Sequence, residues 1–86
     1  MVTRILGTVT GPNGEKIAEA SVYFMAGPVP LPDIAQITDD DGRFRLTAPM
    51  PGTYRIGVRG PDAETTAETT VEVHDEPELA TQVVLG

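Results

Sequence analysis

The segment from Thr38 to Val58 alternates apolar and polar side chains, and it constrains the fold more than any other part of the chain. Apolar residues occupy every second position between residues 44 and 46 and again between residues 54 and 58, with a proline- and glycine-containing turn at 49–52. A period of two predicts β-strands with one buried and one solvated face. The residues expected in the core are Phe44, Leu46, Tyr54, Ile56 and Val58.

The same alternation recurs along the chain, separated by turn signals such as Gly11-Pro12-Asn13-Gly14. Ile17 lies in one connecting segment and is expected to anchor it on the core. The expected strands are Arg4–Thr10, Ala20–Ala26, Ile34–Thr38, Arg43–Thr47, Thr53–Arg59, Glu68–Val73 and Thr81–Leu85. Seven short strands with regular turns and no helical period predict an all-β sandwich.

The length of 86 residues predicts a single domain spanning residues 1–86. The absence of cysteine excludes disulfides, thiolate zinc sites and cysteine nucleophiles. The N-terminal residues lack the charged and apolar regions of a secretory signal, and no apolar run approaches about 18 residues, so membrane insertion is not expected. Two locations stay open: the cytoplasm, or a secreted or cell-surface protein of which this chain is a fragment.

The net charge of −7 is concentrated at one end of the chain. Residues 1–59 contain six acidic and six basic side chains, whereas residues 60–86 contain seven acidic side chains and no lysine or arginine. An acidic surface repels phosphate backbones. Nucleic acid is therefore not an expected partner.

Motifs along nearly the whole chain resemble the carboxypeptidase regulatory-like domain family, which belongs to the transthyretin-like (prealbumin-like) group. In chain order they are Gly7-x-Val9, Gly14, Ile17, Ala20-x-Val22, Thr38-Asp39-x-x-Gly42-x-Phe44-x-Leu46 and Pro51-Gly52-x-Tyr54-x-Ile56-x-Val58. One departure follows Gly60, where many members of the family carry an aromatic residue and this chain has Pro61-Asp62-Ala63.

The resemblance implies a seven-stranded transthyretin-like β-sandwich of three- and four-stranded sheets. The third, second and fifth strands would form the smaller sheet, and the fourth, first, sixth and seventh strands the larger one. Most members of the family have no catalytic site of their own, so the chain is not expected to be an enzyme.

The possible catalytic and metal-binding residues favour structural roles. Asp39-Asp40-Asp41-Gly42 lacks the alternating acids and distal glutamate of a calcium loop and is expected to form a turn. His74 is the only histidine and has no cysteine or second histidine as a metal-binding partner. Hydroxyisourate hydrolases of related fold end in Tyr-Arg-Gly-Ser, whereas this chain ends in Val-Val-Leu-Gly. No cofactor and no metal are expected.

A non-catalytic accessory or interaction module that binds a partner protein or a glycan is the function that these features favour. The alternative is a small structural subunit or stabilising domain packed permanently on a larger enzyme. Function on sandwich folds usually lies in loops at one end, and the loop at 26–33 combines apolar residues with three prolines. The residues expected to bind the partner are Val29, Leu31 and Asp33 in this loop, with the outward Arg43, Arg45 and Arg55 as a second surface.

Overall fold

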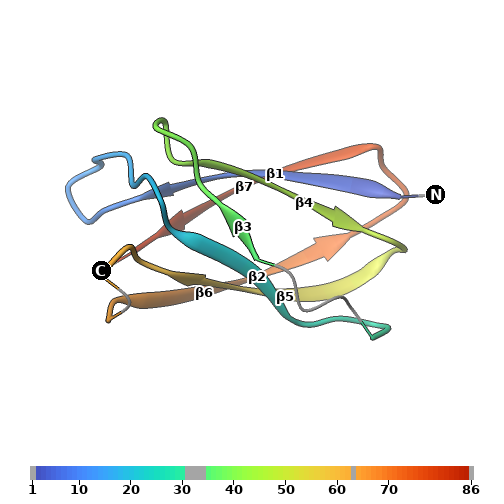
Figure 1. The fold of residues 1–86 in the computed structure, drawn as a ribbon. Coiled ribbons are helices and arrows are strands. Elements are labelled where there is room, and N and C mark those ends of the chain that lie inside the picture. The colour runs from blue at the N-terminus through green and yellow to red at the C-terminus, as the bar shows by residue number, and fades with distance from the viewer. Residues whose placement is uncertain (1, 31–34, 63, 86) are drawn as a thin grey trace.

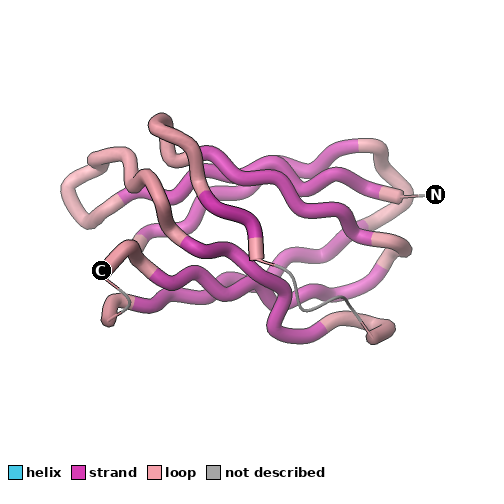
Figure 2. Tube along the Cα trace, viewed as in Figure 1, coloured by secondary structure: helices cyan, strands magenta, loops and turns pink. Residues whose placement is uncertain are grey.

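Seven strands form two sheets that pack face to face in the computed structural model, which describes residues 2–30, 35–62 and 64–85 (Figure 1). The described residues contain no helix, and the remaining segments are turns and loops (Figure 2). The strands are β1 (Thr3–Thr10), β2 (Ser21–Ala26), β3 (Gln36–Ile37), β4 (Arg43–Ala48), β5 (Gly52–Arg59), β6 (Thr66–Val73) and β7 (Glu78–Val84). The expected all-β sandwich of three- and four-stranded sheets is confirmed.

The three-stranded sheet has the order β4-β1-β7 and the four-stranded sheet the order β3-β2-β5-β6. β1 pairs antiparallel with β4 and parallel with β7, whereas all pairs in the larger sheet are antiparallel. β3 and β4 therefore lie at one side of the sandwich, and β6 and β7 lie at the other.

The expected sheet membership of the sixth strand is wrong, because β6 pairs with β5 and not with the sheet that contains β1. The cause is the short connection between residues 59 and 66. Gly60 N–H donates to the Thr65 carbonyl at 2.8 Å, and the Asp62 carboxylate accepts the Glu64 and Thr65 N–H groups at 3.0 and 3.1 Å. A connection this tight joins antiparallel neighbours of one sheet. After β6 the chain crosses to the other sheet in the loop before β7.

The hydrophobic core lies between the sheets and contains every residue predicted there from the segment 38–58. Phe44 and Leu46 are each 5% exposed, and Tyr54, Ile56 and Val58 are fully buried. The rest of the buried core consists of Ile5, Val9, Ala20, Val22, Ala48, Val71, Val73, Val83 and Leu85. Ile17 packs against this core, as expected of an anchor for its loop.

Two hydroxyl groups fasten the connections to the core. Thr38 is buried, and its Oγ1 accepts the Ala20 N–H at 2.9 Å and donates to the Ile17 carbonyl at 2.8 Å. The Tyr54 hydroxyl donates to the Met50 carbonyl at 2.6 Å and so holds the turn between β4 and β5. Both side chains thereby satisfy backbone groups that the sheet ladders leave without partners.

The acidic segment at residues 39–42 is the turn into β4, as predicted. Asp39 Oδ1 accepts the N–H groups of Asp41 and Arg43, each at 2.9 Å, and the Asp39 carbonyl accepts the Gly42 N–H. Gly42 has φ +73°, a conformation that residues with a Cβ rarely adopt. The turn brings the start of β4 beside β3.

Candidate interaction edge

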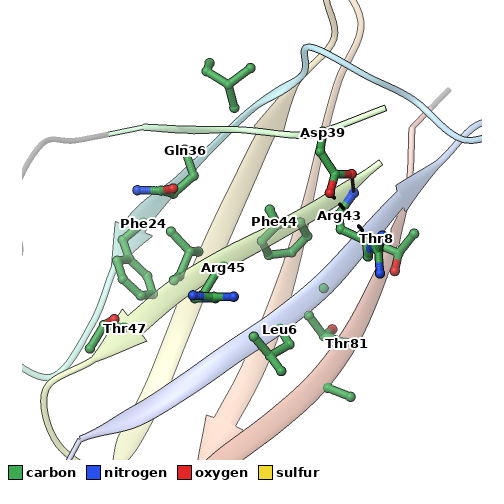
Figure 3. Close-up of a pocket in the computed structure, with 14 residues that line it drawn as sticks. Leu6, Thr8, Phe24, Gln36, Asp39, Arg43, Phe44, Arg45, Thr47 and Thr81 are labelled. Atoms are coloured by element: carbon green, nitrogen blue, oxygen red, sulfur yellow. Dashed lines mark hydrogen bonds and ion pairs between the residues drawn. The ribbon is translucent and has the colours of Figure 1, made fainter. Parts of the chain in front are cut away.

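β4 is an outer strand of its sheet, and the neighbouring β3 extends over only two residues. A hollow remains where the two sheets meet at this side of the sandwich (Figure 3). We call it the edge hollow, and its lining includes Phe24, Gln36, Phe44, Arg45, Leu46 and Thr47. Gln36 and Phe24 lie on one side of the opening in Figure 3, and Arg45 and Thr47 lie along the other.

The backbone of β4 presents hydrogen-bonding groups to this side. Val9 N–H donates to the Gly42 carbonyl, and the antiparallel register continues from there through Gly7 opposite Phe44. The N–H and C=O groups of successive residues in a strand point in alternate directions. The backbone groups of Phe44 and Leu46 therefore bond to β1, and those of Arg45 and Thr47 point away from it. Among the described residues, Asp39 alone bonds the outward backbone of β4, at Arg43. We call the outward backbone groups of Arg45 and Thr47 the β4 edge.

Phe24 gives the edge hollow its apolar floor. Its side chain faces between the sheets, and its ring lies 5.2 Å from the Tyr54 ring, centroid to centroid. The register between β2 and β5 shifts just after Phe24, between residues 24 and 26, where a bulge bends the strand. The ring is half-buried, whereas Tyr54 is fully buried. An apolar segment placed at the β4 edge would therefore find an aromatic surface to pack against.

Arg43 is bound to the acidic turn that precedes it. Its Nη2 lies 2.7 Å from Asp41 Oδ2, and its Nε lies 3.6 Å from Asp39 Oδ2. The backbone N–H of Arg43 is also the main reason that the pKa of the Asp39 carboxyl lies below its ordinary value, with smaller contributions from the Asp41 N–H and the Arg43 charge. The turn acids thus neutralise Arg43 within the domain.

Arg45 has no such partner among the residues that the structure describes. It is exposed on the outer face of the three-stranded sheet and stands opposite Leu6 of β1. Arg4 lies diagonally across, because its partner on β4 is Thr47. The ion pairs of the described residues involve Lys16, Arg43 and Arg55 but not Arg45. Arg45 is therefore a cation without an internal counter-ion beside the edge hollow.

The arginines expected to form one surface lie on two. Arg43 and Arg45 belong to β4 and face outward from the three-stranded sheet, whereas Arg55 belongs to β5 and faces outward from the other. Arg55 Nη2 lies 2.8 Å from Glu68 Oε1 of the neighbouring β6. This cross-strand ion pair leaves Arg43 and Arg45 as the members of the set at the edge hollow.

The loop expected to bind the partner is described only in part. Val29 is half-buried and lines a shallow pocket formed by residues 24–30. Pro28 packs on Gly52 at the start of β5, so closely that a Cβ at residue 52 would lie 2.7 Å from Pro28 Cγ. Leu31 and Asp33 lie outside the described residues.

Sequence reasoning missed the edge hollow, although one signal for it was present. A proline-rich segment such as 28–32 disfavours a regular central strand, and this segment precedes the two-residue β3. Alternation along residues 20–26 turns Phe24 toward the core, but periodicity alone does not say how completely a neighbouring strand covers an inward ring.

Neither a metal-binding cluster nor a membrane-spanning helix occurs in the part of the chain that the structure describes. Within residues 2–30, 35–62 and 64–85, no group of three or more histidine, cysteine, aspartate or glutamate side chains is arranged to hold a metal ion. His74 is exposed in the loop before β7. The described segments also include no helix long and apolar enough to cross a membrane.

Comparison with known protein families finds a match over residues 4–86 to the carboxypeptidase regulatory-like domain. The chain belongs to this family. Domains of the carboxypeptidase regulatory-like family are β-sandwiches and are generally non-catalytic, in agreement with the fold described above. A search of curated proteins found no match.

Proposed function

We propose that this carboxypeptidase regulatory-like domain is a non-catalytic interaction module that binds an extended segment of a partner protein at the β4 edge. The observation that carries the proposal is the outward backbone of Arg45 and Thr47 beside a hollow with aromatic side chains. In strand addition, main-chain hydrogen bonds supply affinity and pockets for alternate side chains supply specificity. Both features occur together at this place.

The opposite side of the sandwich supports the choice of β4. The outer strand β6 pairs with β5 such that Thr66, Glu68, Thr70 and Glu72 carry the outward backbone groups. Two glutamates along an outer strand discourage pairing with another chain. Between residues 43 and 48 the β4 edge carries Arg43 and Arg45 and no acidic side chain, so it does not repel an acidic segment as β6 does.

The experiment uses the ¹⁵N-labelled domain and an eight-residue peptide that alternates valine and threonine. We expect the amide resonances of Arg45 and Thr47 to shift on titration and their hydrogen exchange to slow. Thr47→Pro removes an outward N–H without removing a bond to β1 and should abolish these changes. The matched control is Thr70→Pro, which makes the same change on β6 and should leave binding intact. Shifts confined to other surfaces, or binding to a glycan array alone, would contradict the proposal.

A second candidate is a subunit packed permanently on a larger protein, and the outer face of the four-stranded sheet supports it. Tyr23 and Met25 cover Gly57 there, and Ile37 lies on the same face, opposite Ser21. Met25 is 46% exposed and Ile37 is 59% exposed. Contiguous apolar residues on a sheet face are typical of stable interfaces.

Light scattering of the protein isolated from its source cells tests this candidate. A stoichiometric complex that Ile37→Ser disrupts, while Thr47→Pro leaves it intact, would favour the permanent subunit. A monomer that binds peptides at the β4 edge would favour the interaction module.

A further inference from the structure

We infer that the segment accepted at the β4 edge is acidic, with glutamate or aspartate at alternate positions and apolar residues between them. The inference rests on the proposed function and names the chemistry of the partner. Its basis is Arg45, which is exposed on the outer face of the three-stranded sheet and has no ion pair with another described residue. Arg4 on the same face has Glu78 of β7 as its cross-strand partner. The turn acids neutralise Arg43, which leaves Arg45 for a carboxylate of the bound segment.

Arg45 is the residue that would bind a carboxylate of the added strand. Arg43 already contacts Asp41 at 2.7 Å and Asp39 at 3.6 Å, whereas no ion pair joins Arg45 to another described residue. An added strand would place every second side chain on the outer face, directly opposite its partner on β4. A carboxylate in that position would lie beside the Arg45 guanidinium, which binds carboxylates in a planar, two-pronged geometry.

Alternation along the added strand determines which way the other side chains of the bound segment point. Residues between the acidic positions would turn toward the sandwich and meet the edge hollow, where Phe24, Phe44 and Leu46 present apolar atoms. Because side chains on a strand change face at each residue, the two surfaces together select an acidic–apolar–acidic–apolar pattern. Either feature alone would be less selective.

Charge also disfavours the binding of an acidic segment to β6, the outer strand of the other sheet. Glu72 lies along β6 and would repel the segment, whereas Glu68 is already paired with Arg55. Glu72 also gives β6 a partial acidic–apolar alternation, in Val71-Glu72-Val73. A second copy of this chain could therefore place its β6 on the β4 edge and compete with the partner segment. For this reason the test also measures the oligomeric state of the domain.

The test compares three soluble peptides of equal length in which valine alternates with glutamate, threonine or lysine. Binding is followed by the amide resonances of Arg45 and Thr47, at low salt and again at high salt, with light scattering to detect dimers. We expect the glutamate peptide to bind about tenfold more tightly than the lysine peptide, since the cross-strand contact at Arg45 changes from attraction to repulsion. Salt should reduce this difference.

Charge reversal at Arg45 provides the decisive variant. Arg45→Glu should invert the preference, so that the lysine peptide binds more tightly, and Thr47→Pro should abolish binding of every peptide. Arg55→Glu makes the same charge change on the other sheet and should leave the preference as it was. Circular dichroism of each variant confirms that it folds.

Three results would overturn the inference in distinguishable ways. Equal binding of all three peptides at the β4 edge would leave the proposed function intact and refute the acidic preference. No peptide binding at the edge would refute the proposed function itself. A dimer that forms without peptide, and that both Thr47→Pro and Thr70→Pro abolish, would identify a second copy of this chain as the occupant.

Discussion

The contact between Gly7 and Phe44 predicts a specific coupling between two strands. Gly7 of β1 faces the core directly opposite Phe44 of β4. The Phe44 ring covers the glycine so closely that Cζ, Cε1 and Cε2 all lie within 2.8 Å of the position that a Cβ would occupy. Real Cβ atoms do not approach other atoms this closely. Gly7→Ala must therefore displace the ring.

The size of the effect follows from two opposing contributions. Overfilling a packed core typically costs about 1–3 kcal/mol. Replacing glycine by alanine reduces the entropy of the unfolded chain and returns roughly 0.4–1 kcal/mol where the backbone conformation is compatible, and Gly7 is not among the glycines with positive φ. We expect Gly7→Ala to lower the free energy of unfolding by about 1–2 kcal/mol. A domain of this length has roughly 4–13 kcal/mol in total.

A double-mutant cycle isolates the ring as the cause. Phe44→Ala would remove about 3–5 kcal/mol and risks unfolding the domain, so Phe44→Leu is the better partner. Without the ring atoms above residue 7, the added methyl group has space. Gly7→Ala should then be neutral or slightly stabilising in the Phe44→Leu background, which gives a coupling energy of about 1–2 kcal/mol.

Urea unfolding followed by far-ultraviolet circular dichroism measures all four proteins of the cycle. With a slope near 1 kcal/mol per molar urea for a chain this small, the expected shift in midpoint is about 1–2 M. Thr8→Ala, one residue away on the outer face of β1, is the control and should shift the midpoint little. If Gly7→Ala has the same effect with phenylalanine and with leucine at position 44, the contact is not the cause and this argument is wrong.

Three further substitutions test the connections between strands. Thr38→Val should lower the free energy of unfolding by about 2–4 kcal/mol in urea titrations, because the Ala20 N–H and the Ile17 carbonyl would lose their buried partner; a change below about 0.5 kcal/mol would contradict this role. Glu19 has φ 61°, so Glu19→Gly should raise the melting temperature by relieving strain of about 1 kcal/mol; a lower melting temperature would show that the strain is absent. The pKa of Asp39 is depressed mainly by the Arg43 N–H, so its contribution to stability is present above about pH 4 and lost as the pH falls through the folded pKa. Asp39→Asn should therefore flatten the decline of the urea midpoint in acid, and an unchanged acid profile would exclude this carboxylate as a contributor.

The strands and their buried faces follow from the sequence because the signal for them is local. A strand turns successive side chains to opposite faces, so the alternation around Phe44 and Tyr54 identified core positions without knowledge of any neighbour. The turn at Asp39 and Gly42 was equally predictable, since its carboxylate bonds lie within four residues.

Pairing between strands was not predictable from that pattern. A period of two states which face is buried but not which strand lies beside it. The sheet membership came from the family resemblance, and it was wrong for β6. The family resemblance supplied the number of strands in each sheet, whereas the tight turn that bonds Gly60 to Thr65 decided which strand β6 joins. The register that sets Gly7 beneath Phe44 likewise joins residues far apart in the chain.

The candidate binding surface shows the same division. From the sequence, alternation turned Arg43, Arg45 and Arg55 toward solvent, and all three are exposed. Only the tertiary structure separates them, because β4 and β5 lie in different sheets whose outer faces point in opposite directions. The edge hollow also exists only in three dimensions. It depends on the two-residue length of β3 beside the six-residue β4, and the length of one strand relative to its neighbour is a property of the assembled sheets.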